Sequence, residues 1–362
     1  MSVDSLFRPF TSPRLSLKNR IVMAPMTRSF SPGGVPGGNV AEYYARRARG
    51  EVGLIITEGT VVDRPGAAND PAVPHFHGAA ALEGWARVVE AVHAEGGRIA
   101  PQLWHVGSAI NAQNRDDTHA ESPSGLYKPG RAHGHEMTVA DIDATIAAFA
   151  SAAASARAIG FDAVELHGAH GYLIDQFQWE GTNQRGDIWG RERGRFARLV
   201  VEAVRDVLGD MPLILRLSQW KQQDYDCKLA PTPQSMADWL APLAAAGVDI
   251  FHCSQRRFWD PEFPDAAEGA NLNFAGWAKK LTGMPSITVG SVGLSGDFIA
   301  GFSGEPSEPA SIDGLVERLE ADEFDLVAVG RALIVDPDWA LKVRDGQADF
   351  TRFERSALGT LV

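Results

Sequence analysis

The sequence predicts an α/β protein built as a (β/α)8 TIM barrel, and three observations lead to this expectation. Short apolar runs rich in β-branched residues recur along the 362-residue chain. Helical segments separate these runs, as parallel strands joined by crossovers require. Polar residues and glycines gather directly after most of the runs, which is where barrel enzymes build their sites. A doubly wound open sheet is the alternative, but no Gly-x-Gly-x-x-Gly follows the first run.

The expected strands share near-continuous apolar character, as strands covered on both faces do. They are residues 21–24, 54–57, 98–103, 163–167, 213–217, 250–253, 286–289 and 326–329.

The helices have recognisable ends. Thr138 and Asp141 resemble a capping box before an Ala-rich helix that ends near Gly160, and Thr232 precedes a proline suited to a first helical turn. Further helices are expected over residues 83–95, 192–208, 234–246 and 313–320.

Two long excursions follow the third and sixth expected strands, at residues 106–137 and 254–273. Excursions of this length are usually functional. We expect the first to form a lid or rim and the second to form an aromatic rim, with surface decoration as the alternative. No repeat, linker or low-complexity tract indicates a second domain, so one domain is expected over residues 1–362. The long loops would cover the C-terminal face of its barrel.

Composition narrows the class of protein. Hydrophobic residues make up 44% of the chain, and 46 acidic against 34 basic residues give a formal charge of −12, which argues against a broad nucleic-acid surface. Cys227 and Cys253 form no Cys-x-x-Cys pair, so neither a disulfide framework nor a cysteine-ligated cluster is expected within one chain. With no apparent leader or membrane span, we expect a cytoplasmic monomer or homodimer.

The most informative stretch runs from Val164 to Tyr172, where an apolar strand leads into His167, His170 and Tyr172. Two imidazole N–H groups can hold a carbonyl or nitro oxygen, while a phenol delivers a proton to a neighbouring carbon. This is chemistry on an electron-poor double bond. A zinc site is one alternative, although a third ligand at a recognisable spacing is missing. Purely structural histidines are another.

A phosphate site is expected at the ends of the last two strands. Gly290 and Ser291 follow the seventh strand, and Gly330 and Arg331 follow the eighth. Glycine allows close approach of the backbone, and a guanidinium can make a two-pronged contact with phosphate. The ligand would be a phosphorylated cofactor or substrate.

Three groups deeper in the barrel mouth suit a flat heterocycle. Gln102 can donate and accept, Thr27 can donate to a ring carbonyl, and Arg216 can neutralise negative charge at the ring's far edge. An isoalloxazine needs these three contacts, and a cation near N1 favours the reduced flavin. A buried ion pair is the alternative role for Arg216.

Several segments have the order and spacing of one known family: 17–28, 102–105, 161–176, 216–218, 289–290, 330–331 and 336–338. Through them the chain resembles, nearly end to end, the Old Yellow Enzyme family of FMN-dependent ene-reductases. The resemblance implies a non-covalently bound FMN, with NADPH or NADH as reductant and a small enone, enal or nitro compound as substrate.

The resemblance also implies roles for individual residues. His167 and His170 would bind the activating oxygen, and Tyr172 would donate a proton to the α-carbon while hydride reaches the β-carbon from flavin N5. The flavin ring would be held by Ala24, Pro25, Met26, Thr27, Gly59, Gln102 and Arg216. Its phosphate would be held by Gly290, Ser291, Gly330 and Arg331.

Two other functions are compatible with the sequence. The same flavin could oxidise an amine or saturated substrate, as in dehydrogenase and demethylase relatives, although those usually carry cysteine clusters that this chain lacks. A barrel that binds a phosphorylated ligand without turnover is the third possibility.

The chain departs from the family pattern at three places. After Asn183, Arg185 and Asp187, residues 189–192 replace an aromatic residue and Gly-Gly-Ser. Residues 255–259 do not map onto the usual pattern, and the tail after Asp349 lacks the aromatic ending that some members place over the flavin. These departures bear on substrate choice.

Overall fold

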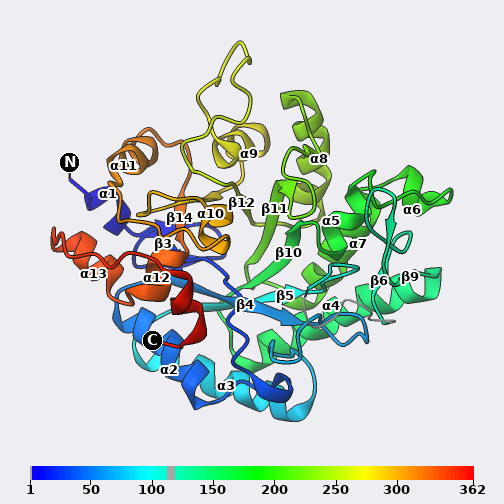
Figure 1. Ribbon diagram of the computed structural model, residues 1–362, viewed down its shortest axis with the longest axis horizontal. Helices are drawn as coiled ribbons and strands as arrows, with labels where there is room; N and C mark the ends of the chain where they lie inside the picture. The colour runs from blue at the N-terminus through cyan, green and yellow to red at the C-terminus, as the bar shows by residue number, and fades with distance from the viewer. Residues whose placement is uncertain (1, 112–118) are drawn as a thin grey trace.

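A closed barrel of eight parallel strands forms the centre of the computed structural model, which describes residues 2–111 and 119–362 (Figure 1). The strands are β3 (Ile21–Met23), β4 (Leu54–Val61), β5 (Ile99–Trp104), β10 (Val164–His170), β11 (Leu213–Lys221), β12 (Ile250–Ser254), β13 (Ser286–Val289) and β14 (Leu326–Val329). The ring is complete because β14 pairs with β3 and β5 pairs with β10, both in parallel. The predicted barrel is therefore confirmed, and each expected run contains a strand.

Helices cover the outside of the barrel. The long ones are α2 (Gly38–Arg49), α3 (Ala79–Ala94), α4 (Val139–Ile159), α7 (Arg195–Leu208), α8 (Pro233–Ala246), α9 (Phe274–Thr282) and α11 (Asp313–Glu320). The predicted capping box of Thr138 and Asp141 is present, and Thr232 forms a second one with Ser235. The helix expected from residue 192 begins at Arg195, because a separate turn, α6 (Ile188–Arg191), is capped by Asp187 just before it.

Short elements complete the chain. They are α1 (Asp4–Phe7), β1 (Phe10–Thr11), β2 (Ser16–Leu17), η1 (Pro32–Gly34), α5 (Leu173–Gln178), α10 (Phe298–Phe302), α12 (Arg331–Val335), α13 (Trp339–Arg344) and η2 (Arg355–Gly359). The antiparallel pair β1–β2 places Phe10, Leu15 and Leu17 in one buried cluster with inward barrel residues such as Val22 and Leu54. This cluster fills one part of the barrel interior with apolar side chains, so the barrel is packed there.

The helix α4 is long and apolar enough to cross a membrane by length and composition, contrary to the expectation that no run approaches a span. In the fold, α4 follows β5 and packs mainly against α7, with α3 on another side. Phe149, Ala152 and Ala156 on its inner face belong to the main hydrophobic core. Its apolar composition is thus used in packing against the barrel.

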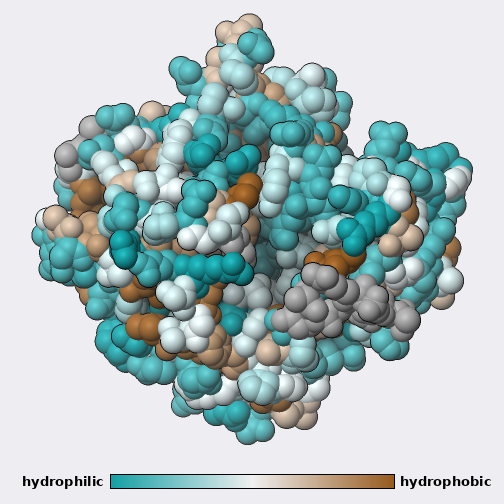
Figure 2. Space-filling model, viewed as in Figure 1, coloured by the Kyte–Doolittle hydropathy of each residue, from teal (hydrophilic) through white to brown (hydrophobic). Residues whose placement is uncertain are grey.

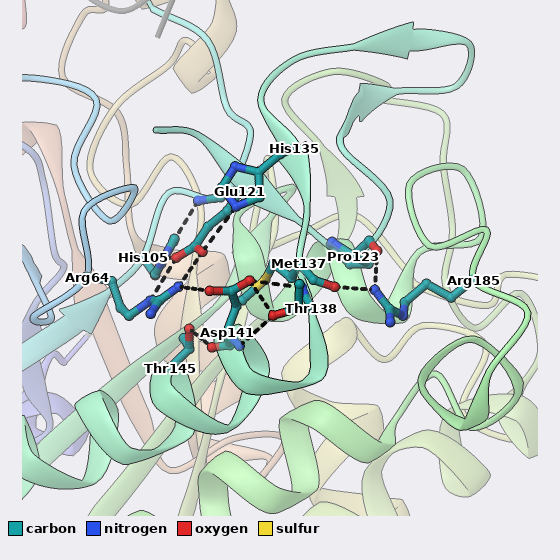
Figure 3. Close-up of polar contacts among 11 residues, drawn as sticks. Arg64, His105, Glu121, Pro123, His135, Met137, Thr138, Asp141, Thr145 and Arg185 are labelled. Carbon is teal, nitrogen blue, oxygen red and sulfur yellow. Dashed lines mark hydrogen bonds and ion pairs between the residues drawn. The ribbon is translucent and has the colours of Figure 1, made fainter. Parts of the chain in front are cut away.

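The excursion 106–137 contains two small sheets, with residues 112–118 outside the described part of the chain. The strand β6 (Glu121–Ser122) pairs with β9 (His135–Glu136), and β7 (Leu126–Lys128) pairs with β8 (Arg131–Ala132). Arg185 donates to the carbonyls of Pro123 and Met137 and pairs with Asp187, so the Asn-x-Arg-x-Asp pattern fastens this excursion to the barrel (Figure 3).

The excursion 254–273 does not form the aromatic rim that the sequence predicted. Phe258 and Phe263 are buried in the main core, and Phe263 packs edge-on against Trp277 of α9. Trp259 is exposed but does not line the barrel mouth. That prediction was wrong because α9, which the sequence did not reveal, gives these aromatic rings an apolar partner inside the core.

Candidate active site

A cavity of about 610 Å³ opens at the carboxyl ends of the barrel strands. The surface in Figure 2, viewed as in Figure 1, is hollowed near its middle. The predicted residues that line this active-site cavity are Ala24, Pro25, Met26, Thr27, Gln102, His167, His170, Tyr172, Arg216, Gly290, Ser291, Gly330 and Arg331. Residues from widely separated parts of the sequence thus meet at one place, and the volume is within the range of sites for cofactor-sized ligands.

Gly59 is the predicted flavin contact that does not line the active-site cavity. It lies in β4 opposite Gln102 of β5, next to a bulge in the pairing. A methyl group at this position would come within 2.5 Å of the Trp104 ring. Gly59 therefore gives Trp104 room to pack, and Trp104 itself lines the cavity.

The end of β10 brings His167, His170 and Tyr172 to one wall of the cavity. The ring centroid of His167 lies 4.9 Å from that of Tyr172 and 5.1 Å from that of His170, both edge-on. His170 has a positive φ of 67°, and its backbone N–H donates to Ser218 Oγ over 2.9 Å. This hydrogen bond from β11 helps to hold the sparsely populated backbone conformation that turns the chain toward Tyr172.

Both imidazoles are neutral at physiological pH. Burial lowers the pKa of His167 and of His170 well below the ordinary value, and the positive charge of Arg216 lowers both further. The backbone N–H of Ala169 donates to Nδ1 of His167 over 3.4 Å, so the neutral ring carries its proton on Nε2. His167 lines the cavity, so this N–H is the donor that the predicted oxygen-binding role requires.

His170 is linked to Arg216 through one hydroxyl group. Nε2 of His170 lies 2.8 Å from Ser254 Oγ, and Nη2 of Arg216 donates to the same oxygen over 3.4 Å. Because Ser254 accepts from the guanidinium, its own proton is available to His170, which would leave the imidazole proton on Nδ1. Ser254 was not predicted, since the expected strand ended one residue before it.

Tyr172 is held in its protonated form. Burial raises its pKa, and a hydrogen bond from Gln222 partly offsets that effect. The amide Nε2 of Gln222 donates to the phenolic oxygen over 3.0 Å. A neutral phenol with its oxygen already accepting one hydrogen bond is a competent proton donor.

A buried ion pair supports the turn that carries these side chains. Nζ of Lys221 lies 2.7 Å from Oδ1 of Asp175, and both side chains are fully buried. The other carboxylate oxygen of Asp175 accepts the backbone N–H of Gly171, between His170 and Tyr172. The pair therefore joins the end of β11 to the turn after β10.

A polar network lies inside the barrel beside Arg216. Glu165 is fully buried, and its carboxylate accepts from Gln102 Nε2 over 2.7 Å and lies 2.6 Å from His252 Nδ1. This network fixes the side-chain amide of Gln102. Nε of Arg216 is buried and makes no hydrogen bond with the described residues. Arg216 lines the cavity with this donor unpaired, and it forms no ion pair with the part of the chain that the structure describes, so the alternative role as a buried ion pair is not seen there.

The predicted phosphate-binding residues lie together at another part of the cavity. Arg331 donates to the backbone carbonyls of Gly296 and Asp297, and its guanidinium lies 5.4 Å from the ring of Phe353. Phe353 also lines the cavity, together with Leu358 of η2. The tail after Asp349 therefore supplies an aromatic side chain to the cavity wall beside Arg331.

Sequence reasoning missed two aromatic residues beside His170. Trp220 stacks on His170 with centroids 4.6 Å apart, and Tyr225 lies 5.6 Å from Trp220. Both line the cavity because β11 continues to Lys221 instead of ending at Leu217. Period-two alternation beyond Arg216, through Ser218 to Trp220, is the signal that could have found the first of them.

Comparison with known proteins agrees with this geometry. Residues 5–299 match the NADH:flavin oxidoreductase / NADH oxidase family. The chain belongs to this family, that of Old Yellow Enzyme. It is 31% identical to 12-oxophytodienoate reductase 7 of Oryza sativa subsp. japonica, over 94% of this chain and 87% of that protein. It is 34% identical to the NADPH dehydrogenase of Bacillus velezensis, over 92% of this chain and 93% of that protein.

Solved structures give the same result. Morphinone reductase in complex with tetrahydroNAD superposes with a TM-score of 0.80 at 29% identity, covering 98% of this chain and 93% of its own. The Old Yellow Enzyme homologue from Zymomonas mobilis superposes with a TM-score of 0.79 at 26% identity, covering 98% and 96%. As a member of this family, the chain is an NAD(P)H-dependent flavin oxidoreductase whose cofactor is FMN.

The residues present fit FMN. The unpartnered buried donor of Arg216 suits the electron-rich edge of a flavin, and the fixed amide of Gln102 suits its heteroatoms. Arg331 and the glycine-flanked backbone at Gly290 and Gly330 lie on the same cavity and suit the phosphate. In an Old Yellow Enzyme family member, these groups would hold the ring and the phosphate of one FMN molecule.

A second polar cluster lies away from this cavity. Ligand atoms of Glu121, His135 and Asp141 lie within 4.8 Å of one another. Figure 3 shows the guanidinium of Arg64 between the two carboxylates, hydrogen-bonded to both, with His105 at Oε1 of Glu121, the oxygen that also accepts from Nε of Arg64. Arg64 already supplies the positive charge that a cation would bring, so the cluster acts as a clamp on the excursion 106–137.

Proposed function

We propose that this protein reduces the activated C=C bond of small α,β-unsaturated carbonyl or nitro compounds at the expense of NADPH or NADH. The observation that carries the proposal is the meeting of two neutral imidazoles and a protonated phenol on one wall of a flavin-sized cavity. The names of its relatives support it, because 12-oxophytodienoate reductase and morphinone reductase are reductases of small molecules by name.

The side chains of the trio would divide the work between oxygen binding and proton transfer. His167 and His170 donate hydrogen bonds to the carbonyl or nitro oxygen, where negative charge develops during reduction. Oriented donors of this kind contribute about 3 kcal/mol each to lowering the barrier. Tyr172 donates its proton to the α-carbon. FMN held at Arg216, Gln102 and Arg331 would supply the hydride chemistry between NAD(P)H and the β-carbon.

Neighbouring residues contribute positive charge to this site and pack against its histidines. Arg216 would favour negative charge on a bound flavin ring, since its guanidinium is buried and its Nε has no partner among the described residues. The ring of Trp104 stacks on His167, and the ring of Trp220 stacks on His170. The substrate is thereby limited to molecules that place an oxygen at the imidazoles and an alkene over the ring.

An anaerobic absorbance experiment tests the proposal. The purified protein should show flavin bands that bleach with NADPH and return when cyclohexenone or a nitroalkene is added. Bands that stay bleached with both acceptors would contradict alkene reduction while leaving the flavin oxidoreductase intact.

A Tyr172→Phe variant refines the test. We expect it to slow return of the bands with cyclohexenone by about 100-fold or more, the usual contribution of a positioned acid, while bleaching by NADPH stays nearly unchanged. Equal loss in both half-reactions would contradict the assignment of Tyr172 as the proton donor.

A further inference from the structure

Arg256 belongs to the sequence run that the family pattern left unexplained, and the structure places it on the wall of the active-site cavity. Its Nη2 donates to Asp297 Oδ2 over 3.0 Å. Its side chain is 38% exposed, although its Nε is sealed from solvent. A partly exposed guanidinium at the edge of a cavity is suited to an anionic group of a ligand.

The charge around Arg256 is only partly neutralised. Arg257 donates to the same Oδ2 of Asp297 over 3.1 Å, so one carboxylate serves two guanidinium groups. That carboxylate also accepts the backbone N–H groups of Ile299 and Ala300 through its other oxygen. The group therefore carries a surplus positive charge beside the cavity.

Aromatic side chains connect Arg256 to the catalytic wall. The guanidinium carbon of Arg256 lies 5.7 Å from the centroid of the Tyr225 ring. Tyr225 is next to Trp220, and Trp220 is stacked on His170. A ligand with its reactive end at His170 can thus extend along these rings and reach Arg256 without leaving the cavity.

Tyr225 and Phe298 stand out among the apolar side chains of this surface. Both are large and more than a third exposed, at 37% and 38%, and both line the active-site cavity. Phe298 directly follows Asp297, the partner of Arg256. Exposed aromatic rings beside a cation suit a flat base that carries phosphate groups, because the rings stack and the guanidinium pairs.

We propose that Arg256 and Tyr225 form a subsite for the phosphates and the adenine of the reducing dinucleotide. Arg256 would pair with a phosphate, and Tyr225 would stack against the base. The inference rests on the proposed function in one respect, namely that the nicotinamide ring enters the cavity at the histidines, where the alkene later binds. It identifies Arg256 as a residue that sets affinity for NADPH and NADH, separate from the groups that carry out alkene reduction.

The test compares a full dinucleotide with a truncated hydride donor. Anaerobic stopped-flow reduction of the flavin is measured with NADPH and with 1-benzyl-1,4-dihydronicotinamide, which lacks phosphate and adenine. For Arg256→Gln we expect the apparent Kd of NADPH to rise about tenfold, the effect of losing one hydrogen bond to a charged group. The limiting rate with NADPH and all constants with the truncated donor should be unchanged.

Arg257→Gln is the matched control. Arg257 has the same charge and the same carboxylate partner but does not line the active-site cavity. We expect it to change the Kd of NADPH by less than about twofold, because only the screened long-range field is altered. Tyr225→Leu should weaken NADPH binding and spare the truncated donor, as Arg256→Gln does.

Three results would contradict the proposal that Arg256 and Tyr225 form a dinucleotide subsite. Equal weakening by Arg256→Gln and Arg257→Gln would indicate a general field effect. Equal loss with both hydride donors would indicate damage to the catalytic wall. A fall in FMN content or affinity in Arg256→Gln would show that Arg256 binds the flavin phosphate instead. Failure of enone reduction alone contradicts only the proposed function, because the subsite is measured in the nucleotide step.

Discussion

The side-chain amide of Gln222 donates a hydrogen bond to the hydroxyl of Tyr172 over 3.0 Å. This contact stabilises the phenolate that forms as Tyr172 gives up its proton, and it opposes the rise in pKa that burial imposes. Gln222 lies just after the end of β11, so the acidity of Tyr172 is set by a neighbouring strand and not by β10 alone.

Replacing Gln222 should therefore affect the proton-transfer half of the cycle. For Gln222→Leu we expect cyclohexenone to reoxidise the reduced protein about tenfold more slowly, because one hydrogen bond to the developing anion is lost. Reduction by the truncated hydride donor should not change. Gln222→Glu provides a comparison, since its carboxylate cannot donate to the phenol and should slow the step further. Normal reoxidation by both variants would contradict the role of this contact.

Gly59 is expected to tolerate no side chain, for a steric reason. A methyl group at this position would lie 2.5 Å from a ring carbon of Trp104, which packs edge-on against Tyr172. Gly59→Ala should lower the free energy of unfolding by about 1–3 kcal/mol and slow enone reduction through displacement of Trp104. Gly38→Ala is the control, because a methyl there meets nothing within 4 Å. Urea unfolding and enone turnover are the measurements, and equal behaviour of the two variants would contradict the prediction.

We expect the ion pair of Lys221 and Asp175 to contribute strongly to the free energy of unfolding, because it is buried. Both side chains are fully buried, so Lys221→Met leaves a carboxylate without its counter-charge. We expect a loss of about 3–5 kcal/mol in the free energy of unfolding, partly recovered in the double variant with Asp175→Asn. The exposed pair of Arg87 and Glu83 is the comparison, and Arg87→Met should cost less than about 1 kcal/mol. Similar losses from Lys221→Met and Arg87→Met would show that burial is not decisive.

Glu58 should make stability depend on pH. Burial raises its pKa to about 7, above its ordinary value of 4.5. The folded protein therefore holds this proton more tightly than the unfolded chain does. The stabilisation is complete below about pH 4.5 and is lost as pH rises through 7, amounting to about 3 kcal/mol.

Glu58→Gln isolates this effect. An amide oxygen can still accept the backbone N–H groups of Arg28 and Ser29, which both donate to Oε2 of Glu58. We expect the variant to match the parent protein near pH 5 and to be more stable near pH 8, as measured by urea unfolding at both values. Glu90→Gln, at an exposed position of α3, should show no such trend. A stability difference that is the same at both pH values would contradict the raised pKa.

The barrel could be predicted because its strands are buried on both faces, but the ends of several strands could not, and the differences are largest at β4 and β11. The expected strands ended at Thr57 and Leu217, whereas β4 continues to Val61 and β11 to Lys221. Polar residues interrupt the apolar pattern at those points. Glu58 and Lys221 are nevertheless buried, because partners supplied by the fold satisfy them.

The helix α2 was missed for a related reason. Its last turn carries three arginines, which suggests a solvated segment. In the structure Arg47 is fully buried and donates to the carbonyls of Leu333 and Ile334, at the end of the adjacent helix α12. These partners are 286 or more residues away in the sequence, so the residues around Arg47 do not indicate that it is buried.

The grouping of His167, His170 and Tyr172 at the cavity could be predicted because the three residues lie within a six-residue stretch at one strand end. Trp220, Tyr225 and Arg256 could not, since their place at the cavity depends on how far β11 extends and on the path of the chain after β12. The residues that follow one strand indicate the chemistry of the site. The residues that line the rest of the cavity follow several different strands, so no single stretch of sequence indicates them.

The clamp around Arg64 has a consequence for how this protein can diversify. Arg64 and Arg185 fasten the second half of the excursion 106–137, at Glu121, Pro123 and Met137, and residues 109–111, which precede these anchors, line the active-site cavity. The part of the excursion that precedes the anchors can vary in length and composition while the barrel core stays as it is. Substitutions in this loop can thus change which substrates fit the cavity, while the barrel strands that position His167, His170 and Tyr172 stay the same.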